Sequence, residues 1–113
     1  MKLHPEPLRE LPESVKLLMA HMGGSHRQTL LGMAARGPTL MVFLRHLGCV
    51  FCRQTLADLR EAKPVLAARG ISIALIHMAS DRQAELVFRL YGMEGEARFS
   101  DPDRSFYQAF GLR

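Results

Sequence analysis

Cysteine, tryptophan and long apolar runs are scarce in this 113-residue chain, and their scarcity excludes several classes of protein. The two cysteines, Cys49 and Cys52, are too few and too close together for a small fold held by several disulfides. The longest wholly apolar run, residues 40–44, is far shorter than the roughly 20 residues of a membrane-spanning helix. Residues 1–7 contain no apolar segment of signal-peptide length. We therefore expect a cytoplasmic protein that does not bind membranes.

Aromatic residues are also few, at 7% of the chain, and the basic residues do not form a stripe. The net charge is +4, but the basic side chains are scattered among apolar and acidic ones. Proteins that bind nucleic acids usually combine a basic stripe with stacking aromatic rings. We therefore expect no nucleic-acid partner and a mildly basic, solvated surface. The hydrophobic content of 48% is that of an ordinary globular domain.

The first part of the chain, residues 1–37, is predicted to be an N-terminal arm followed by short helices. Three of the six prolines lie within residues 1–12, where they favour extended, irregular backbone. In residues 13–22 the apolar side chains recur with the spacing of one helical face: Val15, Leu18, Met19 and Met22. Ser25 is the expected N-cap of a second helix, which Gly37 ends.

Residues 38–113 are predicted to form an α/β domain on a parallel or mixed sheet. Residues 39–44 and 71–78 are mostly apolar and do not alternate with polar residues, which is typical of strands covered on both faces. Between them, residues 50–69 place one set of side chains on a single helical face: Cys52, Thr55, Leu56, Leu59, Ala62 and Leu66. A strand, a helix and a strand in this order predict a βαβ unit with parallel pairing. Pro64 is expected to kink or split the helix, because proline removes a backbone donor.

Turn and cap residues mark the remaining elements. Gly70 is placed to end the first long helix, and the capping-box sequence Ser80–Gln83 starts another that Gly92 stops. The inner face of this helix carries Ala84, Val87, Phe88 and Tyr91. Residues 97–100 are predicted to be a short third strand, and Asp101–Pro102 to cap and begin a last helix. That helix turns three aromatic residues toward the core: Phe106, Tyr107 and Phe110.

The clearest chemical signal is the C-x-x-C spacing of Cys49 and Cys52 directly after the first strand. Beside a βαβ unit, this spacing is typical of a thioredoxin-like redox motif. Cys49 falls where the helix starts, and the free N–H groups of a helix N-terminus stabilise an anion. Such a position lowers the pKa of a thiol and raises its thiolate fraction. We predict that Cys49 is the nucleophile and that Cys52, one helical turn later, resolves the mixed disulfide.

Residues around the cysteine pair are predicted to assist it. His46 can stabilise the Cys49 thiolate or shuttle a proton, and it can equally be a solvated loop histidine. The expected substrate contacts are Arg45, Gly48, Val50, Phe51 and Arg53. The two arginines can lower the pKa of Cys49, although a solvated arginine is the commoner outcome. Phe51 can contact a partner or belong to the core.

Two other interpretations of the cysteines stay open. Both residues can be small buried hydrophobic side chains without a reaction of their own. Alternatively, four side chains of suitable type could hold zinc: His46, Cys49, Cys52 and His77. A second C-x-x-C is missing from the sequence, so we expect neither a metal nor an organic cofactor.

Two segments resemble a known family: FLRHLGCVFCR at residues 43–53 and SDPDRSFYQAFGL at residues 100–112. They are similar to segments of the thioredoxin-fold, peroxiredoxin-like proteins of the alkyl hydroperoxide reductase/thiol-specific antioxidant group, selenoprotein-L-related branch. The resemblance covers residues 38–113 and implies a thioredoxin-like fold and an antioxidant role for them.

The sequence departs from typical peroxiredoxins near Cys49. Val42 stands where the family has a proline, and His46 stands where it has a threonine or serine that orients a peroxide. The cis-proline that faces the motif in thioredoxins and the C-terminal hairpin of the family have no counterpart. We therefore expect the helical N-terminus or a second copy of the chain to cover an open sheet edge, and a homodimer as the assembly.

Together these observations predict a thiol–disulfide oxidoreductase or peroxiredoxin-like antioxidant enzyme. Its substrate would be a disulfide or a peroxide, and a thiol reductant such as a thioredoxin or glutathione system would supply electrons. The alternative is a non-catalytic thioredoxin-fold interaction module. Thiol titration separates the two, because an enzyme of this kind cycles between two free thiols and one internal disulfide.

Overall fold

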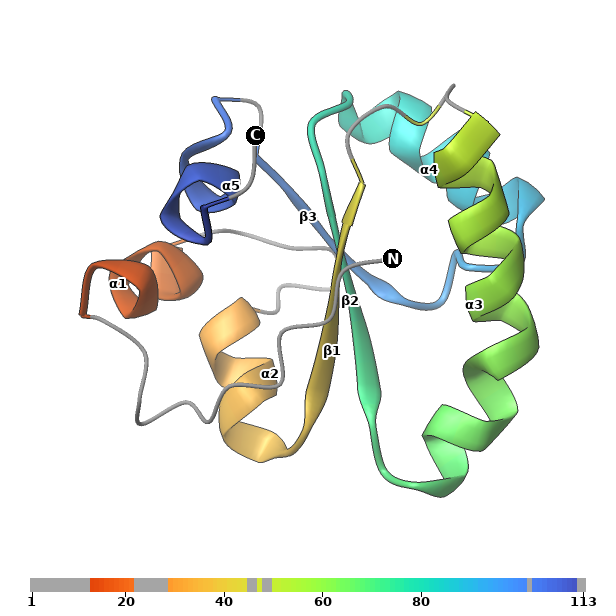
Figure 1. The fold of residues 1–113 in the computed structure, drawn as a ribbon, viewed down its shortest axis with the longest axis horizontal. Coiled ribbons are helices and arrows are strands. Elements are labelled where there is room, and N and C mark those ends of the chain that lie inside the picture. The colour runs from red at the N-terminus through yellow and green to blue at the C-terminus, as the bar shows by residue number, and fades with distance from the viewer. Residues whose placement is uncertain (1–12, 22–28, 45–46, 48–49, 102, 112–113) are drawn as a thin grey trace.

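The computed structural model describes residues 13–21, 29–44, 47, 50–101 and 103–111, which form the helices and strands of Figure 1. In chain order the elements are α1 (Glu13–His21), α2 (Leu30–Arg36), β1 (Thr39–Leu44), α3 (Val50–Ala68), β2 (Ser72–His77), α4 (Asp81–Leu90), β3 (Ala97–Ser100) and α5 (Ser105–Ala109). None of the described helices is long and apolar enough to cross a membrane.

The strands form one parallel sheet in the order β1-β2-β3. The register of the first pair ends with Leu44 opposite His77, and that of the second pair ends with His77 opposite Ser100. β1, α3 and β2 therefore form the predicted βαβ unit. The predicted α/β class with a parallel sheet is confirmed, as is the short third strand.

Helices cover both faces of the sheet, with α3 and α4 on one face and α1, α2 and α5 on the other (Figure 1). The α3–α4 core consists of Val42, Leu44, Leu47, Cys52, Leu56, Leu59, Ile73, Leu75, Ala84, Phe88 and Met93. The α1–α5 core consists of Val15, Met19, Leu30, Met33, Met41, Ala74, Ile76, Ala97, Phe99, Phe106 and Tyr107. Successive strand residues point to opposite faces, so β1 and β2 supply both cores. This is why their apolar runs do not alternate.

Both predicted N-terminal helices are present, and they pack on the sheet face that also holds α5. The prediction of Ser25 as the cap of the second helix is wrong. α2 begins at Leu30 and its N-cap is Thr29, whose hydroxyl accepts the N–H of Gly32 at 3.0 Å. Ser25 itself lies outside the described residues. Serine and threonine cap helices almost equally well, so the side chain directly before the first buried residue takes the role.

α3 continues through Pro64, so the expectation that this proline splits the helix is wrong. Pro64 lies on the exposed side, where the carbonyl that loses its helical partner can bond to water. On the inner side, Leu56 and Leu59 are fully buried and hold the helix along the sheet. Their packing outweighs the proline penalty, which is about 3 kcal/mol in a helix interior.

α3 and α4 both end at a glycine in the left-handed conformation, Gly70 and Gly92, each with φ of +71°. After α3, the N–H of Gly70 donates to the Ala67 carbonyl. The N–H of Ile71 donates to the Leu66 carbonyl, which completes a Schellman motif. Glycine adopts this conformation without a steric penalty, and both predicted stops are confirmed.

α4 begins as its capping-box sequence predicts. The hydroxyl of Ser80 accepts the N–H of Gln83 at 3.2 Å. Ala84 and Phe88 are fully buried on the inner face of the helix. The capping sequence and the spacing of the apolar residues thus agree on where α4 starts and which face it buries.

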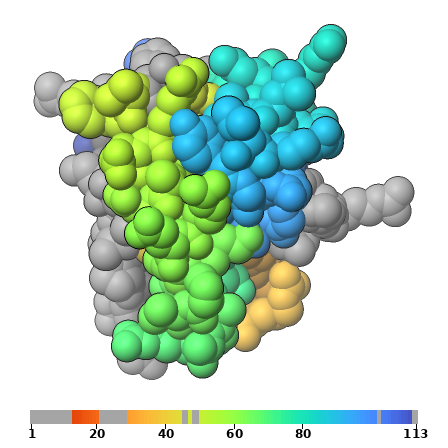
Figure 2. All heavy atoms as spheres, turned by 90° about the vertical axis from the view of Figure 1, so that its right-hand side faces the viewer, coloured from red at the N-terminus to blue at the C-terminus, as the bar shows by residue number. Residues whose placement is uncertain are grey.

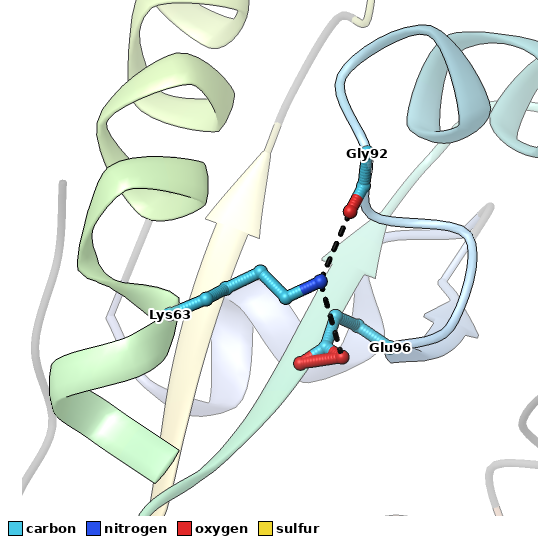
Figure 3. Close-up of polar contacts among 3 residues, drawn as sticks. All are labelled: Lys63, Gly92 and Glu96. Carbon is cyan, nitrogen blue, oxygen red and sulfur yellow. Dashed lines mark hydrogen bonds and ion pairs between the residues drawn. The ribbon is translucent and has the colours of Figure 1, made fainter. Parts of the chain in front are cut away.

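A lysine joins α3 to the turn that follows α4 (Figure 3). Nζ of Lys63 donates to the carbonyl of Gly92 at 3.0 Å and lies 3.9 Å from the carboxylate of Glu96. Figure 2 looks onto this outer layer, where α3 and the segment after α4 lie side by side. The contact therefore connects two elements of one layer that are far apart in the sequence.

Candidate functional site

The carboxyl ends of β1, β2 and β3 lie at one edge of the sheet, because all three strands are parallel. Leu44, His77 and Ser100 are the last residues of these strands. α3 begins at Val50, shortly after β1 ends, so the predicted redox motif belongs to this edge. Open α/β sheets commonly hold their functional sites outside the carboxyl ends of the strands.

The predicted site lies partly outside the described residues. Arg45, His46, Gly48 and Cys49 are among the residues that the structure does not describe. Leu47, which lies between them, is 1% exposed and belongs to the α3–α4 core. The roles of these four residues stay predictions, and the structure defines the frame that carries them, namely the end of β1 and the start of α3.

Cys52 is the third residue of α3 and is only 9% exposed. Its free thiol packs in the α3–α4 core. The first turn of a helix has N–H groups without helical partners, and they favour negative charge at the helix start. A largely buried thiol inside the first turn suits resolution of a nearby disulfide better than first attack, which requires access.

The other predicted contacts on α3 are exposed. Val50 is 72% exposed and Phe51 is 79% exposed, and Arg53 also faces solvent. Phe51 is therefore not a core residue, which removes one of the two interpretations of its role. Two adjacent apolar side chains at the start of α3 are available for contact with another molecule.

His77 is a buried polar residue at the same edge, and the sequence pointed to it only as a zinc ligand. Its imidazole is fully buried and contacts Phe88 edge-on at 5.8 Å between ring centroids, and neither nitrogen has a hydrogen-bond partner among the residues that the structure describes. Burial lowers the pKa of His77, and this effect outweighs the opposing influence of the Asp81 carboxylate. No three metal-binding side chains come together within the described part of the chain.

Asp101 links β3 to α5. Its carboxylate accepts the backbone N–H groups of Phe106 at 2.9 Å and Tyr107 at 3.1 Å, and its own N–H donates to the His77 carbonyl at 2.7 Å. Burial raises the pKa of Asp101, although these two hydrogen bonds favour the ionised form. The prediction of Asp101 as the N-cap directly before the helix is wrong, because the N-cap of α5 is Arg104, although the Asp101 carboxylate does accept amides of the first turn. α5 begins only at Ser105, because the carboxylate reaches forward across the turn to its amides.

Tyr107 connects α5 to both longer strands. Its side chain is buried, and its hydroxyl hydrogen-bonds the carbonyl oxygens of Leu44 and Ile76, the latter at 2.8 Å. The sequence predicted that this ring faces the core, and it does. The polar contact was missed, although a tyrosine in a buried aromatic set signals that its hydroxyl has a partner.

Comparisons with known proteins agree with this architecture. No protein-family model matches the chain. Among curated proteins, the thioredoxin-like protein AAED1 of Arabidopsis thaliana, a chloroplast protein by name, is 37% identical over 70 residues. That match covers 62% of this chain and 28% of the relative, so the chain spans less than a third of the relative's length. The cytoplasmic location expected from the sequence stays a prediction.

Solved structures of similar fold include two proteins of Xanthomonas campestris. A cysteine-to-serine variant of peroxiredoxin Q superposes with a TM-score of 0.73 at 18% identity, covering 90% of this chain and 63% of that one. The bacterioferritin comigratory protein, in structures that address its alkyl peroxide reduction, gives 0.73 at 17% identity and covers 94% and 66%. The chain therefore has a thioredoxin-like fold of the type found in peroxiredoxins, and it spans just under two thirds of these neighbours.

Proposed function

We propose that this chain is a thiol–disulfide oxidoreductase in which Cys49 and Cys52 form the redox pair. The observation that carries the proposal is the position of Cys52 in the first turn of α3, at the carboxyl edge of a thioredoxin-like sheet. Cys49 precedes it by three residues and therefore comes just before the helix N-terminus. Free amides at that end of α3 would stabilise the Cys49 thiolate.

The proposed reaction has two steps on the protein. The Cys49 thiolate attacks one sulfur of a substrate disulfide, forms a mixed disulfide and releases the other sulfur as a thiolate. The Cys52 thiolate then attacks Cys49, which forms the internal disulfide and releases the second substrate thiol. Two electrons pass from the cysteine pair to the substrate, and an external dithiol such as reduced thioredoxin, or two molecules of glutathione, returns them.

A peroxide would enter the same cycle differently. The Cys49 thiolate would attack the peroxide, break the O–O bond and become a sulfenic acid, while the alcohol leaves. Condensation with the Cys52 thiol would then release water and form the same internal disulfide. Because His46 replaces the hydroxyl residue of typical peroxiredoxins, we propose disulfide exchange as the main activity and peroxide reduction as a secondary one.

Residues next to the pair would bind the substrate and tune Cys49. The exposed side chains of Val50 and Phe51 offer an apolar contact beside the motif, and Arg53 adds a positive charge. Arg45 and Gly48 would complete this contact, and His46 would favour the thiolate or move a proton. A positive neighbour of this kind lowers the pKa of a thiol.

The test is thiol chemistry on the wild type, Cys49→Ser and Cys52→Ser. We expect mild oxidant to convert two free thiols of the wild type into one internal disulfide, and alkylation near pH 7 to label Cys49 first. Cys49→Ser should abolish turnover of a model disulfide and of an alkyl hydroperoxide. Cys52→Ser should instead accumulate mixed disulfides, because the resolving thiol is missing.

Two results would contradict the proposal. Faster labelling of Cys52, identified by mass spectrometry, would reverse the two roles. Two thiols that stay free under oxidant, with no turnover of either substrate, would instead support the non-catalytic interaction module.

A further inference from the structure

We infer that Tyr107 is a positioning residue for the Cys49 segment, and this inference rests on the proposed role of Cys49. The hydroxyl of Tyr107 ties α5 to the carbonyl of Leu44, the last residue of β1, directly before the segment that carries Cys49. The same hydroxyl reaches the carbonyl of Ile76 on β2 at 2.8 Å. It therefore fixes the exit of β1 relative to its neighbouring strand.

The hydrogen bond to Leu44 matters because the Tyr107 hydroxyl lies where the pairing of β1 and β2 ends. Leu44 and His77 form the last pair in the register of β1 and β2. The backbone leaves the sheet at this point and enters α3 at Val50. A phenol hydroxyl carries one proton, so it donates to one carbonyl at a time while lying between two. Buried carbonyls at a strand end need such a partner.

The ring of Tyr107 is itself held firmly. Its backbone N–H donates to the Asp101 carboxylate at 3.1 Å, and its side chain is 2% exposed. Phe43 meets the Tyr107 ring edge-on, with 5.1 Å between ring centroids. Asp101 in turn donates its N–H to the His77 carbonyl at 2.7 Å. α5 is thus linked to all three strands at the edge that bears the motif.

The contacts of Tyr107 would affect the reactivity of Cys49 by holding the end of β1 in place relative to α3. The helix amides stabilise a thiolate only if the sulfur is held close to the N-terminus of α3, and the effect falls off within one turn. A looser exit from β1 would let the Cys49 segment move relative to α3. The thiolate would then lose part of its stabilisation, and the pKa of Cys49 would rise.

The experiment uses a single-cysteine background, Cys52→Ser, so that only Cys49 reacts. The rate constant of alkylation by iodoacetamide is measured from pH 5 to 9 with and without Tyr107→Phe. We expect Tyr107→Phe to move the pH profile upward and to slow alkylation at pH values below the pKa of the parent by about three- to tenfold, equivalent to about half to one pKa unit. Tyr91→Phe is the matched control, since Tyr91 is the other tyrosine and lies at the end of α4, and its profile should equal that of the parent.

The outcomes separate this inference from the proposed function. If the parent titrates as an ordinary cysteine near pH 8.5, the proposed activation of Cys49 is wrong and so is the inference. If the parent has a low pKa but Tyr107→Phe matches Tyr91→Phe, the inference alone is wrong, even where Tyr107→Phe lowers thermal stability. Should Tyr107→Phe fail to fold, Asp101→Asn tests the same link and should shift the profile in the same direction. Failure of both to fold would make the link purely structural and overturn the positioning role.

Discussion

His77 is a polar residue in fully buried, largely apolar surroundings. Within the described part of the chain it is the buried side chain whose nitrogens find no hydrogen-bond partner. Leaving a buried donor or acceptor unsatisfied costs about 1–3 kcal/mol, which is large beside the 5–15 kcal/mol of a typical domain. Burial disfavours the protonated ring, as does Arg98, whereas the neighbouring Asp81 carboxylate favours it. Burial dominates, so the pKa of His77 lies below its usual value and folding favours the neutral ring.

This leads to a prediction on the pH dependence of stability. The pKa of His77 is lower in the folded chain than the ordinary 6.5 of the unfolded chain. The folded state therefore binds this proton less readily than the unfolded chain does. As a result, the free energy of unfolding is highest above pH 6.5 and falls as the pH drops below it, by at most about 1.4 kcal/mol per pH unit. Urea unfolding of the wild type and His77→Leu between pH 5 and 8 measures this.

We expect His77→Leu to flatten that dependence. Because leucine brings no unsatisfied polar atom, its stability near pH 7.5 should equal or exceed that of the wild type. An unchanged slope in His77→Leu would assign the pH dependence to other groups.

Between elements, the Lys63 contact is the clearest long-range polar link of the α3–α4 layer. The hydrogen bond from Lys63 to the Gly92 carbonyl is short, at 3.0 Å, while the ion pair with Glu96 is long, at 3.9 Å. The lysine side chain is 33% exposed, so solvent weakens the charge interaction. The hydrogen bond to the turn should therefore matter more than the ion pair.

Two variants test this ranking. We predict that Lys63→Met lowers the free energy of unfolding by about 1 kcal/mol, because a partly buried turn carbonyl loses a charged donor. Glu96→Gln should cost less than about 0.5 kcal/mol, as expected for a partly exposed ion pair. Urea unfolding at one pH measures both, and equal losses in the two variants would show that the ion pair is the main contact.

The elements differ in how far the sequence could predict them. Strands buried on both faces leave unbroken apolar runs, and Gly70 and Ser80 act within one turn of their own position, so these features were predictable. The expected split at Pro64 does not occur, because tertiary packing, which local propensity does not contain, supports its helix. The start of α5 was misjudged because the Asp101 carboxylate reaches amides five and six residues ahead.

The candidate site was predictable in its motif but not in its surroundings. The spacing of Cys49 and Cys52 after a strand is a local signal, and Cys52 lies where that signal placed it. The contacts of His77 and Tyr107 depend on how separate elements approach one another. No periodicity or spacing reports such contacts, so only the folded arrangement identifies these residues.

For the molecule as a whole, the N-terminal helices cover a face of the sheet and do not extend it. Val15 and Met19 of α1 belong to the same core as Phe106 of α5. Among the described strands, β1 pairs only with β2. No described strand pairs with the other edge of β1. The sequence predicts that the α1 stripe or a second copy of the chain covers the open sheet edge. α1 packs on a face of the sheet instead, so a second copy stays the predicted cover for the edge.

Self-association is therefore the prediction at this scale. We expect sedimentation velocity to show a dimer whose fraction rises with protein concentration, because a strand edge that no other described strand pairs with favours pairing with another chain. Circular dichroism should show the same secondary structure across that range, since pairing at an edge does not require refolding. A monomer at every concentration would contradict the prediction.

The parallel arrangement of the sheet also constrains how the chain reaches its fold. Thr39 must meet Ser72, and Ala74 must meet Ala97, so a complete helix separates the two members of each strand pair. No hairpin can bring neighbouring strands together early, and the entropy of closing a long loop opposes every strand contact. α3 and α4, with terminal hydrogen bonds made within one turn, shorten those loops when they form. Folding speed in this protein should therefore depend on helix formation more than on strand propensity.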